Sequence, residues 1–515
     1  MPTYLSPGVY VEEVASGSRP IAGVGTAVAA FVGFAEKGPF NEPTLITNWS
    51  QFVQRFGDFS EDYYLARSIY GYFLNGGGAA YVVRLGNHQQ EEEEKPRYAK
   101  AVLPAAGGSD RPALTVRAMQ EGVSGDEVSI DVAEASEHSN DNFKLIVNVA
   151  GKPEESFDNV TVKKGPRNVV TVVRRESKVI TVEEVKGAPV AVPHTGARVE
   201  LSGGAPLPVP SVPALSAEQY VGNTLDRTGF AGLEAIDAIT MLCVPDAVGA
   251  LDRGALSIDG LKTVQQAMIA HCELMADRMA ILDTPPNLNA QQVKAWREET
   301  TGYDSKYAAM YWPWPRVMDP VAGRPVAVPP SGYLAGIWAR NDTTRGVHKA
   351  PANEVVRGAL GLELAITKGE HDQLNPIGVN CIRAFPGQGI RVWGARTLSS
   401  DTEWRYINVR RLFNYVEESI LNGTNWVVFE PNDQRLWDSV TRTVTMFLRG
   451  VWRDGALFGP TPESSFFVKC DAENNPAESR DEGILNVEVG IAPVKPAEFI
   501  VFRVSQFAEG AGLEE

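Results

Sequence analysis

The stretch YYLARSIYGYFLNGGGAAYVVRL, residues 63–85, joins a helical pattern to a short strand. Apolar residues recur at helical spacing over residues 63–74, and Asn75 with the three glycines after it would end that helix. Residues 79–85 are apolar and partly β-branched, which favours a strand. An apolar run over residues 26–34 precedes them, so this part of the chain predicts a compact β-α-β unit.

The second half of the chain continues the alternation of strands and helices. Strands are expected over residues 236–244, 279–282 and 306–312, and helices over residues 257–277 and 290–299. Such alternation predicts an α/β layer. Further on, the pattern predicts strands at 379–384, 390–393, 466–470, 484–491 and 498–506, and long helices at 404–421 and 432–452.

A different pattern separates these two regions. Polarity rises abruptly at residues 89–94, QQEEEE, where adjacent carboxylates repel one another and cannot enter a core. Short β-branched runs follow at 114–117, 128–132, 143–149, 168–173 and 178–185, which predict a small all-β domain. Residues 187–213 are rich in proline and small residues, as expected of a stiff linker that returns to the core.

Bulk composition excludes several classes of protein. With 515 residues, 43% of them hydrophobic, the chain is too long for one core, and it lacks both a signal-peptide pattern and an apolar run long enough to span a bilayer. Its four cysteines lie far apart, without zinc-finger spacing, so reduced thiols are expected. A net charge of −16 argues against binding to nucleic acid.

Candidate sites for chemistry are weak. The glycines at 76–78 and 387–389 lack the spacing and the strand-to-helix context of phosphate-binding loops. His271, Cys272 and Glu273 are adjacent on a predicted helix and would point in different directions. His371 and Asp372 lie in a charged stretch with no GxSxG motif. We therefore predict no enzyme activity, no catalytic residue, no metal and no cofactor.

Two further patterns allow two interpretations each. Residues 311–315, YWPWP, could form an aromatic ligand platform, but burial in a core is favoured. Arg435, Arg442 and Arg449 recur every seven residues and so share one face of a predicted helix, while apolar residues line another. This face could bind an acidic partner, or it could be an ordinary solvated surface.

The two chain ends are alike in kind. Residues 4–14 and 498–506 are competent to form strands and are flanked by proline or glycine, and neither has an obvious local partner. An extended arm of this type can add a strand to the open sheet edge of a neighbour. This pattern predicts a device for polymerisation.

Several motifs resemble the contractile tail sheath proteins of bacteriophages, tailocins and related extracellular injection systems. The amino-terminal motifs are PTYLSPGVYVEEV, GVGTAVAAFVGFAEKGP, ITNWSQFVQRFG and YGYFLNGGGAAYVVRL. The carboxy-terminal motifs are PSGYLAGIWARNDTTRGVHKAPAN, NPIGVNCIRAFPGQGIRVWGARTL, WRYINVRRLFNYVEESI and DEGIL. They cover about half of the chain, whereas residues 87–220 resemble no family that we can name.

The resemblance implies an α/β (α+β) multidomain fold, in which both chain ends form a core of mixed sheet and helices and a small all-β domain is inserted. The expected divisions are an N-terminal linker arm (1–20), the N-terminal part of the core (21–88), the inserted outer domain with its proline-rich linker (89–220), an α/β middle domain (221–375), the C-terminal part of the core (376–496), and a C-terminal linker strand and tail (497–515).

The resemblance also implies functional roles. The arms would link subunits through Tyr4, Val9, Tyr10, Val11, Phe499, Val501, Phe502 and Val504, and Arg435, Arg442 and Arg449 would contact an inner tube. Expected partners are further copies in stacked hexameric rings, the tube protein, and baseplate and terminator or cap proteins, without nucleic acid or membrane insertion. Assembly is expected in the bacterial cytoplasm, before incorporation into a phage tail or release as an extracellular particle.

Two other classes remain as alternatives. The chain could be a non-contractile surface or ligand-binding protein that uses the inserted domain, and it would then form monomers or closed oligomers. A hydrolase hidden in the α/β region would need a concave site where histidine and carboxylate groups converge.

Overall fold

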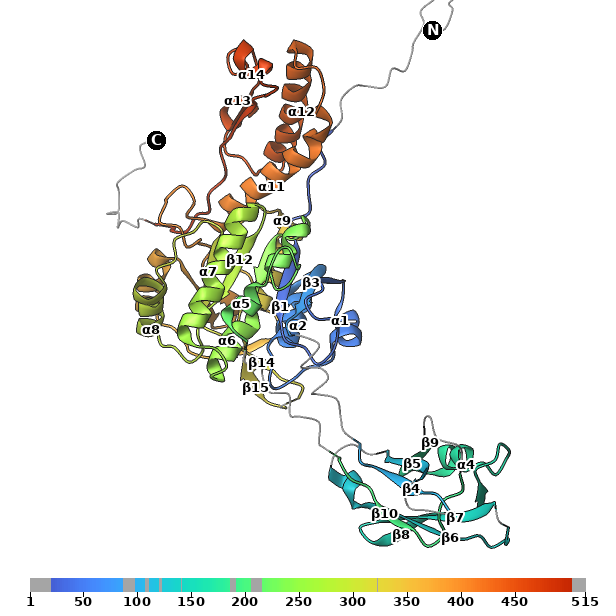
Figure 1. Ribbon diagram of the computed structural model, residues 1–515. Coiled ribbons are helices and arrows are strands. Elements are labelled where there is room, and N and C mark those ends of the chain that lie inside the picture. Colours follow the sequence, from blue (N-terminus) through green and yellow to red (C-terminus); the bar gives the residue numbers. More distant parts are fainter. Residues whose placement is uncertain are drawn as a thin grey trace, which may run out of the picture. The chain divides into compact units, whose positions relative to one another are not determined.

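The computed structural model describes residues 20–86, 98–106, 111–119, 123–139, 141–185, 191–204, 215–321 and 323–502. The chain divides into two compact units (Figure 1). Residues 1–86 and 212–515 make the first unit, and residues 87–211 make the second. The larger unit is therefore built from both ends of the chain.

An eight-stranded sheet in the order β18-β17-β13-β12-β11-β1-β3-β2 organises the larger unit. Its six inner strands run parallel, and β2 and β18 pair antiparallel at the two edges. The strands are β1 (Val28–Gly33), β2 (Thr44–Ile46), β3 (Ala79–Arg84), β11 (Met241–Cys243), β12 (Met279–Asp283), β13 (Ala308–Trp312), β17 (Val379–Phe385) and β18 (Gly389–Val392).

This sheet corrects the expected division between residues 21–88 and 221–375. Strand β1 pairs with β3 on one side and with β11 on the other, so both stretches contribute to one hydrogen-bonded layer. Strand β3 occupies only one edge of β1. The stretch expected as a separate middle domain supplies the other partner.

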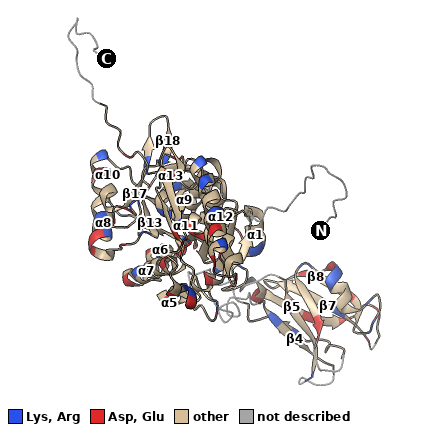
Figure 2. Ribbon diagram, turned by 90° about the horizontal axis from the view of Figure 1, so that it is seen from above, with Lys and Arg blue, Asp and Glu red and all other residues tan. Residues whose placement is uncertain are grey.

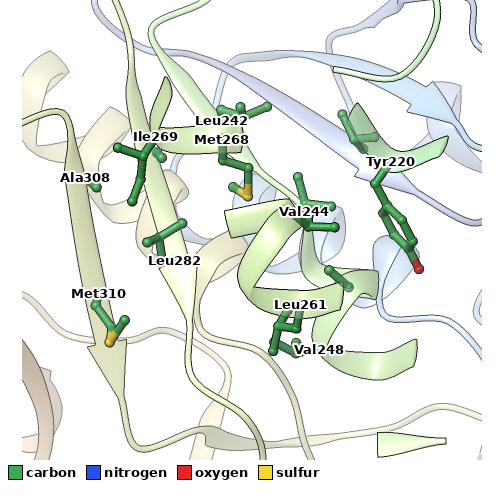
Figure 3. Close-up of a cluster of buried hydrophobic side chains, with 14 of the residues drawn as sticks. Tyr220, Leu242, Val244, Val248, Leu261, Met268, Ile269, Leu282, Ala308 and Met310 are labelled. Atoms are coloured by element: carbon green, nitrogen blue, oxygen red, sulfur yellow. The ribbon is translucent and has the colours of Figure 1, made fainter. Parts of the chain in front are cut away.

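Hydrophobic clusters cover both faces of the sheet. On one face Leu242, Leu282 and Met310 pack against Val248 of α6 and Met268 of α7 (Figure 3). Parallel sheets are covered on both faces, so their strands carry continuous apolar runs. The helices of this unit up to the C-terminal region are α1 (Trp49–Phe56), α2 (Leu65–Asn75), α5 (Ala217–Val221), α6 (Pro245–Asp252), α7 (Ile258–Met275), α8 (Ala290–Ala295), α9 (Ser331–Arg345) and α10 (Lys368–Leu374).

On the other face α2 and α9 approach each other closely because both carry glycines at the contact. A Cβ atom on Gly71 would lie 2.4 Å from the Tyr333 ring, and one on Gly332 would lie 2.4 Å from the backbone oxygen of Ser68. Each distance is shorter than two unbonded atoms tolerate. The glycines in the α2 and α9 motifs therefore allow the two helices to pack directly against each other.

A C-terminal subdomain continues from the sheet. It contains α11 (Ile407–Thr424), α12 (Gln434–Arg453), α13 (Pro462–Ser465), β19 (Phe466–Lys469), α14 (Ala477–Asp481) and β20 (Glu488–Ile491). Its own cluster joins Leu412, Val440 and Phe466, and Ile21 from the start of the described chain packs into it. Near the large sheet, β14 (Pro315–Met318), β15 (Pro325–Ala327) and β16 (Ala359–Leu362) form a small antiparallel sheet.

The second unit contains two antiparallel sheets around its own core. Their orders are β10-β6-β7-β8 and β4-β5-β9. The strands are β4 (Lys100–Pro104), β5 (Pro112–Ala118), β6 (Val128–Glu134), β7 (Asn142–Val149), β8 (Lys152–Thr161), β9 (Ile180–Glu184) and β10 (Arg198–Glu200).

One element of this unit differs from the predicted all-β domain. Residues 168–173 were expected as a strand, but Val169–Glu176 is a helix, α4. The Asn168 side chain caps it by accepting a hydrogen bond from the Thr171 backbone, and Val169 and Val173, four residues apart, are buried. The cap and the four-residue spacing outweigh the β-propensity of the valines, since that propensity depends on context.

Asp283 at the end of β12 is fully buried and holds the start of α9. Its carboxylate accepts hydrogen bonds from the backbone nitrogen and the hydroxyl of Ser331 at 2.8 and 2.6 Å. Burial raises the pKa of Asp283 to about 7, although the bonds from Ser331 lower it. The folded protein therefore keeps a proton that the unfolded chain releases near the usual pKa of about 3.9.

This buried carboxyl predicts a pH dependence of stability. Because the pKa is raised on folding, the stabilising contribution is present below the unfolded pKa and is lost as pH rises through about 7. Asp283→Asn should flatten the decline of the melting temperature between pH 4 and 8, while Asp246, whose pKa burial raises to about 6, keeps part of it. An unchanged pH profile would contradict the prediction.

Candidate assembly surfaces

The helix α12 presents a basic face to solvent. Arg435, Arg442 and Arg449 are all exposed, whereas Leu436 and Val440 point into the subdomain core. Among the described residues, none of the three arginines has an ion-pair partner. Elsewhere Lys and Arg lie interspersed with Asp and Glu on the helices (Figure 2), so an unpaired basic series departs from the chain's acidic balance.

The N-terminal segment is tied to α11 where the described chain begins. The Val24 backbone nitrogen donates to the Ser419 hydroxyl at 3.1 Å, and the Thr26 carbonyl accepts from Arg411 at 2.8 Å. Arg411 also forms a buried bidentate pair with Asp342 of α9 at 2.9 and 2.6 Å. Residues 20–27 are thus clamped between the sheet and the C-terminal subdomain. The predicted arm residues Tyr4, Val9, Tyr10 and Val11 lie outside the described residues.

The last bonded residue of the C-terminal segment in the described chain is Glu498. Its carboxylate accepts hydrogen bonds from Arg396 at 2.9 and 2.5 Å, and from Asn375 at 3.1 Å and Tyr406 at 3.3 Å. Burial raises the pKa of Glu498, but these bonds outweigh burial, so the pKa lies below the usual value. The carboxylate is therefore charged at neutral pH.

Directly after Glu498 the side chains are mostly exposed to solvent. Phe499, Ile500, Val501 and Phe502 are 75%, 73%, 78% and 86% exposed. The sequence predicted a strand here, but residues 498–502 form none in the single chain. The remaining predicted arm residue, Val504, lies outside the described residues. Four consecutive exposed apolar side chains are unusual in a monomer and mark an interaction site.

The hairpin of β19 and β20 offers an incomplete sheet. Its pairing runs from Phe466 opposite Ile491 to Lys469 opposite Glu488, and no third strand among the described residues joins it. One face packs on α12 through Phe466, whereas Phe467 on the other face is 58% exposed. Unpaired edge groups of this kind are a template for a strand from another chain.

The structure places the other candidate residues in the interior. Tyr311, Trp312 and Trp314 are at most 1% exposed, so this stretch is core and not a ligand platform. His271 and Cys272 are buried on α7, and burial together with nearby Arg278 lowers the pKa of His271 to about 4. Gly76 ends α2 in a left-handed conformation and leads to β3, as expected of a helix-to-strand turn.

One cavity brings together residues that the sequence did not single out. A cavity of about 380 Å³ is lined by Asp342 and His348, which are close in the sequence, and by Asp454 from the C-terminal subdomain. Both carboxylate oxygens of Asp342 are already bonded to Arg411, and burial lowers the pKa of His348. No cysteine or serine lines the cavity. We interpret this group as the joint between α9 and α11.

The described ranges contain neither a metal-binding cluster nor a membrane-spanning helix. No group of three or more His, Cys, Asp or Glu side chains there is arranged to hold a metal ion. None of the helices there has both the length and the apolar character that crossing a bilayer requires. The four cysteines are buried as free thiols.

Comparisons with known families match the second half of the chain. The description "phage tail sheath protein central domain" fits residues 238–398, and "phage tail sheath C-terminal domain" fits residues 399–507. The two ranges are contiguous. They include the large sheet from β11 onward, the C-terminal subdomain and the exposed residues after Glu498.

Curated relatives point in the same direction. A prophage major tail sheath protein of Pseudomonas aeruginosa (strain UCBPP-PA14) is 28% identical over 251 residues, which is 47% of this chain and 62% of the relative. The tail sheath protein of Escherichia phage P2 is 24% identical over 298 residues, 56% of this chain and 71% of that protein. The match thus spans less than two thirds of the first relative's length.

Solved structures resemble the chain along almost its whole length. The sheath of an extracellular contractile injection system, the PVC sheath complex in its contracted state, superposes with a TM-score of 0.59 at 22% identity and covers 99% of both chains. The baseplate of the anti-feeding prophage in its contracted state contains a chain with a TM-score of 0.59 at 24% identity, covering 98% of this chain and 99% of that one. At these identities the likeness concerns the fold.

Proposed function

Because the chain belongs to the contractile tail sheath family, we propose that it polymerises as stacked hexameric rings around an inner tube and contracts to drive the tube through a target envelope. The observation that carries this proposal is the C-terminal arm. It is anchored at Glu498, continues as four exposed apolar residues, and belongs to a chain whose β19–β20 hairpin is joined by no third strand among the described residues.

The arms would link subunits by strand addition. The C-terminal arm, with Phe499, Val501, Phe502 and Val504, would add a strand to the β19–β20 hairpin of a neighbouring copy. The N-terminal arm, with Tyr4, Val9, Tyr10 and Val11, would extend the same sheet. Donor and acceptor are different segments of the chain, so the contact is head-to-tail and propagates, as a long tube requires.

Contraction would use the energy stored in the extended lattice. Moving a two-state element from 1:99 to 99:1 takes a bias change of about 5.5 kcal/mol. Shared over a cooperative hexameric ring, this is about 1 kcal/mol per subunit. Small changes in subunit contacts therefore suffice, while the arms keep the rings connected. No nucleotide is required for such a step.

The basic face of α12 would contact the inner tube. Arg435, Arg442 and Arg449 are exposed and unpaired among the described residues, so their charge is free for an acidic partner. The inserted unit, residues 87–211, would occupy the outer surface, since it packs around a separate core. Baseplate and terminator or cap proteins would bind the two ends of the cylinder.

The particle would be assembled in the cytoplasm of the producing bacterium. It would then act as part of a phage tail or as a released contractile device. As a member of a structural family the chain would act mechanically, without catalysis and without binding nucleic acid or inserting into a membrane.

Electron microscopy of the purified chain tests this function. Expressed alone, the chain should form wide, hollow, ridged cylinders, and together with its tube protein it should form narrower cylinders around a tube. Uniform small particles under both conditions would contradict the sheath function and favour a non-contractile surface or ligand-binding protein.

A further inference from the structure

The residue at which the C-terminal arm leaves the subunit is bonded to the large sheet and not to the hairpin next to it in the sequence. Strand β20 ends at Ile491, and Val494 is bonded to Ala456 and Asn408 of the C-terminal subdomain. At Glu498, however, the partners are Asn375, Arg396 and Tyr406, which lie next to β17 and at the start of α11.

Arg396 is itself held by the interior of the sheet. Its backbone nitrogen donates to the side-chain oxygen of Asn380 at 2.7 Å. Asn380 lies on β17, is 0% exposed, and donates to the Met310 carbonyl of β13 at 3.2 Å. The Arg396 and Glu498 side chains are only 9% and 19% exposed. A bidentate pair of this kind is strong and fixed in geometry.

We propose that Glu498 is the mechanical anchor of the C-terminal arm, a positioning residue that passes tension from a neighbouring subunit into the large sheet. This inference rests on the proposed sheath function. The path of the force runs from the arm through Glu498, Arg396 and Asn380 to β17 and β13. Several bonds of this path must break together before the arm lengthens.

Without the anchor the same tension would reach the hairpin. Freeing residues 495–498 would lengthen the arm by roughly 13 Å at about 3.3 Å per residue. The load would then fall on Val494 and on the end of β20, where the pair of Phe466 and Ile491 is the first of the short ladder. Pulling from one end opens such a ladder one pair at a time. The sheet that would receive a neighbour's arm would thereby be damaged.

The test compares sheaths of the natural chain with Glu498→Gln, which keeps the size of the side chain but removes its charge. Losing a charge-assisted pair should raise the fraction of released arms by about tenfold. The variant should keep the melting temperature of the free subunit. Its sheaths, assembled on tubes, are then made to contract by warming. Cryo-electron microscopy should show fragments in place of continuous cylinders. Glu482→Gln, an exposed carboxylate with no ion pair among the described residues, is the matched control.

A charge swap separates an anchor from a general structural role. Glu498→Arg combined with Arg396→Glu should restore continuous contracted cylinders, whereas each single change should not. The same rescue would support the anchor if the single variants formed no cylinders at all. Continuous sheaths from Glu498→Gln, or failure of the swap together with a lowered melting temperature, would overturn the anchor. If the natural chain itself formed no cylinders, this result would contradict the sheath function and therefore also the role of Glu498 as an anchor.

Discussion

Truncation after Glu498 abolishes polymerisation while leaving the subunit folded: this is the largest effect that we expect. The truncation removes Phe499, Ile500, Val501 and Phe502, which are at least 73% exposed in the single chain, so the melting temperature of the subunit should hardly change. In the sheath each of these side chains would bury surface worth about 2 kcal/mol, and each main-chain hydrogen bond would add about 1 kcal/mol.

Ordering the arm, at about 1–2 kcal/mol per residue, and the loss of overall freedom on association together offset most of that gain. Truncation should therefore cost a net free energy of about 3 kcal/mol per arm contact. This corresponds to a factor of about 100 in the concentration needed for assembly. Sedimentation measures the concentration at which the chain assembles, and electron microscopy shows whether cylinders form. Removing only residues 507–515, beyond the predicted strand, is the matched control and should leave assembly unchanged.

The N-terminal arm provides a parallel variant. Deleting residues 1–13 should also give folded subunits that form no sheath, because Ile21, Val24 and Thr26 still hold the rest of the segment on α11. Cylinders of normal length from either truncated chain would refute the corresponding arm.

Reversing Arg435, Arg442 and Arg449 to glutamate should prevent assembly on the tube but not folding. The three side chains are exposed and have no ion-pair partner among the described residues, so their loss breaks no contact within the subunit. At about 1 kcal/mol for each charge pair, the triple change should weaken the sheath–tube contact by about 100-fold, and more where repulsion replaces attraction. The effect should shrink as ionic strength rises.

The matched control reverses Lys152, Lys164 and Arg174, three exposed residues of the inserted unit. This control changes the net charge by the same amount but lies on the unit proposed to face outward. Co-assembly with the tube protein, scored by electron microscopy, distinguishes the two variants. Equal assembly of both with the tube would remove the tube-contact interpretation of α12.

The periodic elements were predictable because their signals are local. The helices α2, α7 and α12 and the strands β12, β13 and β17 lie where the apolar pattern indicated. The arginine series also reached the exposed face of α12, since a seven-residue step returns to the same side of any helix. The aromatic stretch at 311–315 became core, as its continuous apolar character favoured.

Other features depend on contacts that no local pattern contains. The β-branched residues of α4 have strand propensity, but the Asn168 cap and the burial of Val169 and Val173 stabilise a helix instead. Residues 498–502 also have strand propensity, yet a strand requires a partner edge, and among the described residues they pair with none.

From its sequence alone, this protein's α/β class, its inserted unit, its exposed basic helix face and its strand-competent ends could be derived, because periodicity, charge and propensity act between near neighbours. Only the tertiary structure decided that β1 pairs with both β3 and β11, and that Glu498 is bonded to Arg396 across 102 residues of chain. The physical reason is the same in both cases. Hydrogen bonds between distant segments depend on where the whole chain brings them together, and this information is not local.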